Sequence, residues 1–203
     1  MELLAPAGSR QALTAAVQSG ADAVYLGGPQ FGARYSAENF TIEEMKTWVD
    51  YCHLYGVDVH VTVNTLVKEK EIESLKEYLK QLNKIGVDAL IVQDMGAAEI
   101  IKKTVPDMTL HASTQMTVTS LEGVKYLEDM GFSRVVLARE LSEKEIEHIC
   151  KNAKAEIEVF VHGAICMCYS GQCLMSSILG GRSGNRGRCA QPCRLPYDLL
   201  ENG

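Results

Sequence analysis

The stretch Gly86-Val-Asp-Ala-Leu-Ile-Val-Gln-Asp94 shows how this chain is organised. Gly86 stands where a preceding helix should end, because the left-handed residue that closes many helices is usually glycine. The apolar run that follows predicts a strand, and polar side chains come directly after it. The same order of glycine, short turn and apolar run occurs three more times. It precedes predicted strands at residues 23–28, 59–64 and 134–139.

Apolar residues between these runs recur at intervals of three and four, which indicates helices with one buried face. These faces are formed by Ile42, Met45, Val49 and Cys52, by Ile72, Leu75, Leu79 and Leu82, and by Leu121, Val124 and Leu127. Three helix starts have the spacing of a capping box, in which two residues satisfy each other's backbone donors. The pairs are Thr41 with Glu44, Thr119 with Glu122, and Ser142 with Glu145.

Counting residues 2–8, 109–115 and 156–162 as further strands gives a series of seven strand-then-helix units before residue 164. Such alternation predicts a parallel sheet with helices outside. No Gly-x-Gly-x-x-Gly opens the first helix, so a (β/α)8 TIM-type barrel fits better than a doubly wound sheet. A complete barrel takes about 250 residues. We therefore expect a barrel at 1–163 whose last unit is missing or irregular, and a Cys/Gly/Arg-rich segment at 164–203 packed on its rim.

Polar side chains follow most of the predicted strands, as expected where one rim of a barrel carries a site. A histidine at a strand end can contact a substrate, or can simply bond to a neighbouring carboxylate. A carboxylate that points inward needs a partner such as an arginine. The candidate catalytic residues at this rim are His111, Gln115, Arg139, Glu158 and His162.

Five of the seven cysteines lie between residues 166 and 193. Thiols from this region can converge on one centre only if the chain folds back, and five nearby glycines allow such turns. The centre could be an iron–sulfur cluster or zinc; the spacing lacks the Cys-x2-Cys pair of common structural zinc sites. The candidate ligands are Cys166, Cys173, Cys189 and Cys193. We expect Cys52 and Cys150, on helix faces, to be buried small apolar residues.

Charge is shared unevenly along the chain. The net charge of −6 combines a −8 body, residues 1–158, with a +2 tail that holds four arginines and two acids. These arginines could meet an anionic partner locally, or could pair with the acidic body. No apolar run approaches the roughly 20 residues that span a bilayer, and no leader is apparent at Met1. We therefore expect a cytoplasmic protein with no membrane association.

A family resemblance becomes apparent at the cysteine-rich region. The pattern Glu158-x-Phe-x-x-Gly-Ala-Ile-Cys-x4-Gly-x-Cys-x-Met-Ser176 resembles the signature of the peptidase U32 family, the collagenase-like proteins. The resemblance extends over the whole chain. It includes the segments 3–8, 20–27, 39–40, 63–64, 92–94, 111–115, 138–141 and 182–187.

This resemblance implies an RNA-modifying enzyme. Related proteins look like tRNA and ribosomal-RNA hydroxylases and ubiquinone-pathway hydroxylation factors, several of them with a four-iron (4Fe-4S) cluster. Cys166, Cys173 and Cys189 match three cluster ligands, and the fourth family ligand lies beyond residue 203, unless Cys193 or Cys168 replaces it. The resemblance favours formation of 5-hydroxyuridine in tRNA, with prephenate as the oxygen source. Phosphates would be met by Arg182, Arg186, Arg188 and Arg194.

Two other functions stay open. The family name implies a peptidase, although neither His-Glu-x-x-His nor Gly-x-Ser-x-Gly is present. Cys166 and His162 are the residues that a cysteine protease could use. Alternatively, the chain is a non-catalytic subunit that pairs with a second U32 protein.

Overall fold

The chain folds into an open ring of parallel strands surrounded by helices. The computed structural model describes residues 1–33 and 38–198. Its strands pair in sequence order, each parallel to the next, and no pairing between the first and last is found among the described residues. They are β1 (Leu4–Pro6), β2 (Ala23–Gly27), β3 (Asp58–Val63), β4 (Ala89–Val92), β5 (Thr109–Ala112), β6 (Arg134–Val136) and β7 (Glu156–Glu158).

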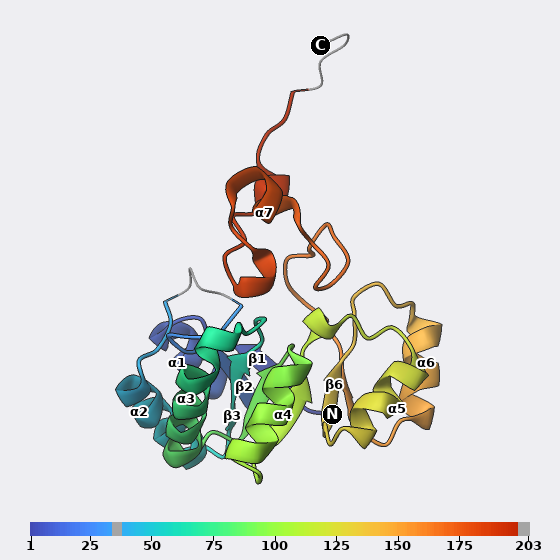
Figure 1. The fold of residues 1–203 in the computed structure, drawn as a ribbon. Helices are drawn as coiled ribbons and strands as arrows, with labels where there is room; N and C mark the ends of the chain where they lie inside the picture. The colour runs from blue at the N-terminus through green and yellow to red at the C-terminus, as the bar shows by residue number, and fades with distance from the viewer. Residues whose placement is uncertain (34–37, 199–203) are drawn as a thin grey trace.

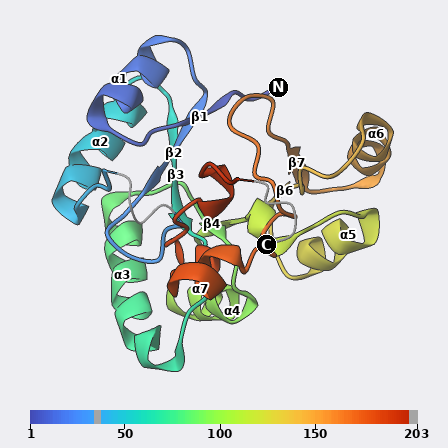
Figure 2. The same ribbon diagram turned by 90° about the horizontal axis from the view of Figure 1, so that it is seen from above.

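Six α-helices follow the first six strands and cover the outside of this ring, as Figure 1 and Figure 2 show. They are α1 (Arg10–Gln18), α2 (Ile42–Leu54), α3 (Ile72–Ile85), α4 (Met95–Thr104), α5 (Leu121–Asp129) and α6 (Glu143–Asn152). The short helix α7 (Met175–Gly180) belongs to the cysteine-rich region, which projects from one end of the ring. The described residues also form four single-turn 3-10 helices, at Glu69–Glu71, Thr114–Met116, Gly184–Arg186 and Pro192–Arg194.

The predicted order of strands and helices is confirmed, and the architecture is that of an incomplete TIM-type barrel. Four strands, β1, β5, β6 and β7, are each at least three residues shorter than expected. β5 ends early because Ser113 caps a 3-10 turn directly after it, and β7 ends where the chain leaves the sheet after Glu158. The capping boxes at Thr41 and Ser142 are present. The one predicted at Thr119 is wrong by a residue, because Ser120 is the N-cap and accepts from the amide of Gly123.

The hydrophobic core lies between the strands and the helices. Alternate strand residues such as Val59, Val61 and Leu90 are fully buried in it, facing the helices. The other set, which includes His60, Thr62 and His111, therefore points into the ring. Cys52 is buried in the core as predicted, and burial raises its pKa to about 11. Cys150 is exposed, so its predicted burial is wrong: it follows the buried Ile149 on α6 and faces away from the core.

Candidate functional site: a pocket beneath the cysteine segment

A cavity of about 180 Å³ opens inside the ring at the carboxyl ends of the strands, and we call it the barrel pocket. This is the end at which barrel enzymes carry their sites. Its polar lining comes from four strands, β2, β3, β5 and β7, or the loops that follow them, and apolar contacts include Ile91, Val136 and Phe160. The polar residues are Tyr25, Glu38, Asn39, Thr62, Asn64, Ser113, Thr114, Gln115 and Glu158.

Glu158 is the acidic group on the β7 side of the pocket. Its side chain is 20% exposed, and Oε2 lies 3.6 Å from Nη1 of Arg134. Burial raises the pKa of Glu158 and outweighs the attraction of Arg134. The carboxyl group therefore keeps its proton to higher pH than a free glutamate. The arginine partner expected for an inward-facing carboxylate is Arg134, whereas Arg139 donates to Ser170.

Arg134 links the two ends of the open ring at its base. It donates to both carboxylate oxygens of Glu2, at 2.6 Å each, and to Oε2 of Glu156 at 2.6 and 2.8 Å. Glu2 precedes β1 and Glu156 begins β7, so this buried guanidinium joins strands that do not hydrogen-bond to each other. The hydrogen bonds from Arg134 lower the pKa of Glu2.

His111 lies deeper in the ring than the predicted rim site. Its ring packs edge-on against that of His60, with centroids 4.7 Å apart, and it is not among the residues that line the barrel pocket. Desolvation, with the charges of His60 and Arg134, lowers the pKa of His111 to about 3. The histidine is therefore neutral at physiological pH. Sequence reasoning missed the pair because the two residues are far apart along the chain.

The cysteine segment, residues 164–198 of the described chain, passes over this end of the ring, and α7 lies over the ring in Figure 2. It touches the barrel at two places. The first anchor, residues 170–172, rests on the loops after β5 and β6; the second anchor, residues 185–187, rests on the loops after β2 and β3. Each anchor contacts a residue that lines the pocket, so the segment spans its mouth.

The first anchor is built around Ser170, which is 1% exposed. Arg139 donates to its Oγ from Nε at 3.2 Å and from Nη2 at 3.1 Å, and the backbone N–H of Ser170 donates to Glu140 at 3.0 Å. Thr117 Oγ1 donates to the carbonyl oxygen of Ser170 at 2.6 Å. Gly171 has φ +73°, and a Cβ there would collide with the carbonyl oxygen of Gln115.

The second anchor combines an ion pair with a close contact between two stretches of backbone. Arg186 donates to both carboxylate oxygens of Glu71, at 2.6 and 3.0 Å, and to the carbonyl oxygen of Leu66. These hydrogen bonds hold the pKa of Glu71 at about 2. A Cβ on Gly187 would collide with the backbone of Gly32 and press on Ala33, a pocket residue. Arg186 thus pairs with the acidic body, one of the two roles predicted for the arginines.

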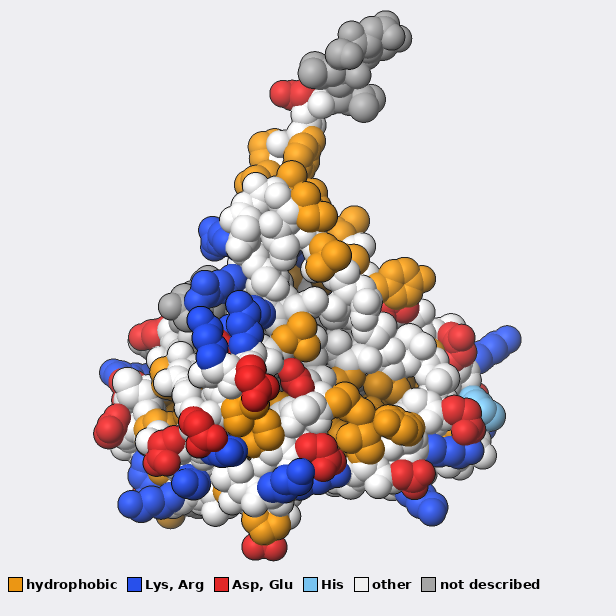
Figure 3. Space-filling model, in the orientation of Figure 1, with side chains coloured by type: hydrophobic (Ala, Val, Ile, Leu, Met, Phe, Trp, Pro, Cys, Tyr) orange, Lys and Arg blue, Asp and Glu red, His pale blue; other side chains and the backbone are white. Residues whose placement is uncertain are grey.

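The remaining predicted arginines lie elsewhere on the segment. Arg182, Arg188 and Arg194 are exposed, and Arg194 donates to the carbonyl oxygen of Ile165 at 2.6 Å. Figure 3 shows Lys and Arg side chains gathered where the segment meets the barrel. The projecting part carries exposed apolar side chains. They include Ile165, Met167, Tyr169, Leu174, Ile178, Leu179, Leu195 and Tyr197.

The five thiols of the segment are free, and two of them are adjacent. The thiol of Cys173 adjoins that of Cys168, and Cys166 is near enough to act on Cys168 electrostatically; burial and these neighbours raise the pKa of Cys168. A Cβ on Gly184 would lie 3.7 Å from Cβ of Cys189 and 3.9 Å from the carbonyl oxygen of Cys173. The chain therefore folds back between residues 173 and 189, as predicted.

Clustered thiols suit an iron–sulfur cluster or zinc in their donor chemistry. In residues 1–33 and 38–198, however, no three Cys, His, Asp or Glu side chains converge closely enough to hold a metal ion. Cys193 and His162 are exposed, with no metal-binding neighbours of this kind in the described chain. The residues thus fit such a centre in type and chain path, while their arrangement leaves the ligand set open.

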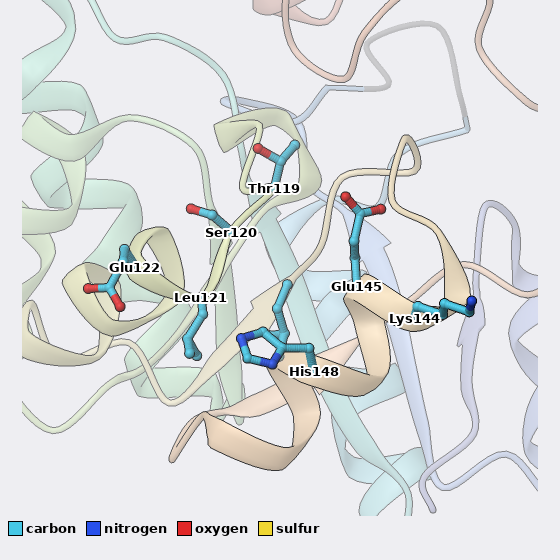
Figure 4. Close-up of a pocket in the computed structure, with 8 residues that line it drawn as sticks. Thr119, Ser120, Leu121, Glu122, Lys144, Glu145 and His148 are labelled. Carbon is cyan, nitrogen blue, oxygen red and sulfur yellow. The ribbon is translucent and has the colours of Figure 1, made fainter.

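A second hollow lies on the outer surface between the N-terminal turns of α5 and α6 (Figure 4). This outer groove has a volume of about 440 Å³. Glu122, Lys144, Glu145 and His148 surround an apolar floor that includes Leu121 and Ile149. It shares no lining residue with the barrel pocket. Barrel enzymes carry their sites inside the carboxyl ends of the strands, so the pocket beneath the cysteine segment is the candidate site.

The sequence profile of peptidase family U32 matches residues 8–203. The chain belongs to this family. It is 46% identical over 202 residues to the 23S rRNA 5-hydroxycytidine C2501 synthase of Escherichia coli K12, covering all of this chain and 30% of that protein. It is 42% identical over 200 residues to tRNA hydroxylation protein P1 of Bacillus subtilis 168, covering 98% and 47%. The chain thus spans less than half the length of these curated relatives.

A solved structure, that of the U32 peptidase Mk0906, supports the fold. The match has a TM-score of 0.68 at 22% sequence identity, and it covers 82% of this U32 chain and 71% of the Mk0906 chain. No helix in the described ranges of this U32 chain combines the length and the apolar character needed to cross a membrane.

Proposed function

We propose that this U32 chain provides the barrel and the cysteine segment of an RNA hydroxylase that acts in the cytoplasm. The supporting observation is a built pocket at the strand ends, covered by a thiol-rich segment, in a chain matched almost throughout by proteins named for tRNA hydroxylation and for 5-hydroxycytidine synthesis in 23S rRNA. The product we favour is 5-hydroxyuridine in tRNA; 5-hydroxycytidine in ribosomal RNA is the related alternative.

In this proposal the barrel pocket holds a small oxygen donor. Its volume of about 180 Å³ slightly exceeds the roughly 150 Å³ cavity that accepts a benzene molecule, so it has room for one ring. Prephenate, which is larger than benzene, would place its ring in the pocket and extend from the mouth. Hydroxyl and amide groups of Thr62, Asn64 and Ser113 would fix its orientation. Glu158 would contact this molecule from the β7 side, and Gln115 would face it from the β5 side.

The RNA would bind above the pocket, with its phosphates at Arg182, Arg188 and Arg194. Arg186 acts instead through Glu71, by holding the segment in place. Cys166, Cys173 and Cys189 are the proposed ligands of an iron–sulfur cluster, with Cys168 or Cys193 or a residue beyond this chain as the fourth; zinc is the alternative metal. A bound cluster would supply the redox centre between donor and RNA.

Nucleoside mass spectrometry tests the function directly. A strain that lacks the gene should lose hydroxyuridine from tRNA, or hydroxycytidine from 23S rRNA if that is the target. The wild-type gene and the control Ser177→Ala, whose side chain makes no hydrogen bond among the described residues, should restore it, whereas Cys173→Ala should not. Unchanged hydroxynucleosides in both RNAs of the deletion strain would contradict the proposal.

A peptidase remains the second candidate because the family and the matched structure carry that name. Its nucleophile would be Cys166, four residues after His162, and both side chains are exposed. The test is cleavage of gelatin by purified protein. Cleavage that Cys166→Ala abolishes, with metal content unchanged, would favour this function. A non-catalytic subunit, suggested by the open ring, would instead be stable only together with a second U32 protein.

A further inference from the structure

The turn Tyr169-Ser170-Gly171 contains the most deeply buried polar contact between the cysteine segment and the barrel. Ser170 has no role in the pocket lining, since its side chain points into the loops after β5 and β6. Three elements nonetheless converge on it: the segment itself, the β5 loop through Thr114 and Thr117, and the β6 loop through Arg139 and Glu140. A buried hydroxyl with that many partners holds one geometry, because losing any partner would leave a buried polar group unsatisfied.

Gly171 fixes the direction in which the chain leaves this turn. Its positive φ is one that other residues rarely adopt, and its missing Cβ allows the backbone to rest on the carbonyl oxygen of Gln115. Gln172 adds a hydrogen bond from Nε2 to Thr117 Oγ1 at 2.9 Å. Cys168 and Cys173 lie two residues before and three residues after Ser170. Their positions over the pocket therefore depend on this turn.

We propose that Ser170 is a positioning residue, with Arg139 and Glu140 acting through it: the three together fix the loop that carries Cys166, Cys168 and Cys173 above the barrel pocket. This assigns to Arg139 a structural task in place of direct contact with substrate. The inference deepens the proposed function, on which its catalytic consequence rests, but the geometry it asserts concerns the protein alone.

Hydrogen exchange and thiol labelling of the purified chain test the geometry without any activity assay. In Ser170→Ala, backbone amides at residues 166–173 should exchange about tenfold faster or more, which corresponds to about 1.4 kcal/mol of lost local stability. Labelling of Cys168 and Cys173 by a maleimide should accelerate similarly. Gly171→Ala should give the same pattern with the hydroxyl intact. Ser177→Ala, in the same segment, should behave as wild type.

Two results would overturn the proposal. Exchange and labelling rates in Ser170→Ala equal to those of wild type would show that the turn holds its place without the hydroxyl. Equal loss of protection in β3 and β4 would show that Ser170 stabilises the whole fold and does not position one loop.

The catalytic consequence is measured separately. If the chain is active in RNA hydroxylation, Ser170→Ala should lower kcat at least tenfold and leave the KM of the small donor unchanged, because Ser170 itself does not line the pocket. A raised donor KM with normal kcat would contradict positioning. Absence of hydroxylation in the wild-type protein would refute the proposed function and leave the exchange result to stand by itself.

Discussion

His111 is a single residue whose protonation opposes folding. Its pKa is about 3 in the folded chain, against an ordinary value near 6.5. Between these values the unfolded chain binds a proton that the folded chain excludes, so His111 supports stability above pH 6.5 and that support is lost as pH falls toward 3. We predict that His111→Phe removes up to about 1.4 kcal/mol per pH unit from the slope of unfolding free energy in this window.

Denaturant titrations of both proteins at pH 7, 5.5 and 4 would measure the slope for His111→Phe. His148→Phe, at an exposed position on α6, is the matched control and should keep the wild-type slope. Parallel curves for His111→Phe and wild type would contradict the buried neutral state.

Glu71 is the residue on which the second anchor depends. Arg186 lowers the pKa of Glu71 from its ordinary value of 4.5 to about 2. The carboxylate therefore stabilises the docked segment fully above pH 4.5, and this stabilisation is lost as pH falls toward 2. Glu71→Gln should weaken docking by about 1 kcal/mol at pH 7, as expected for a partly exposed bidentate pair. The amide of Leu66, which donates to the carbonyl oxygen of Asn185, reports the change.

Hydrogen exchange of the Leu66 amide should be roughly fivefold faster in Glu71→Gln at pH 7, as about 1 kcal/mol implies. Glu77→Gln, on the exposed face of α3, controls for the loss of one negative charge and should leave the amide unchanged. A Leu66 amide that is equally protected in all three proteins would mean that backbone contacts alone hold the anchor.

At the scale of elements, β1 and β7 are joined by Arg134 instead of a strand ladder. Arg134 is buried, but its partners Glu2 and Glu156 are 35% and 66% exposed, so losing the pairs should cost less than the loss of a fully buried pair, about 1–3 kcal/mol. We predict this loss for Arg134→Met, measured by urea unfolding at pH 7. Arg10→Met, which removes an exposed pair with Glu44, should change stability by no more than about 0.5 kcal/mol. Equal losses of stability in the two variants would show that Arg134 contributes no more to stability than an exposed ion pair does.

The sequence predicted these elements well where a local rule governs them. Gly86 ends α3 in the left-handed conformation, and the seven strands follow in the predicted order. The sequence did not predict long-range contacts. No residue close to Arg134 in the sequence indicates that Glu2 is its partner. Thr119 and Ser120 are both able to cap a helix, and the structure has Ser120 as the N-cap. Likewise, the residue pattern indicated that the chain folds back between the cysteines, but not that Ser170 fixes the position of their loop.

At the scale of the whole molecule, the open ring should be stable at its centre and weak at its edges. β3 and β4 each have a hydrogen-bonded strand on both sides, and all four residues of β4 are buried. β1 and β7 pair on one side only, and β7 is partly exposed. Local opening needs less free energy where fewer buried contacts are broken. The two edges should therefore open independently of the centre.

Native-state hydrogen exchange measures this gradient residue by residue. The amides of β4 should exchange only through global unfolding, with a denaturant dependence equal to that of the complete protein. Those of Ala7 and Glu156, which bond to Tyr25 and Ser133, should exchange at least about a hundredfold faster with little denaturant dependence. Arg134→Met should widen the difference, because it removes the link between the edges. Uniform protection from β1 to β7 would mean that the ring is closed in solution, by a partner chain or by a second copy.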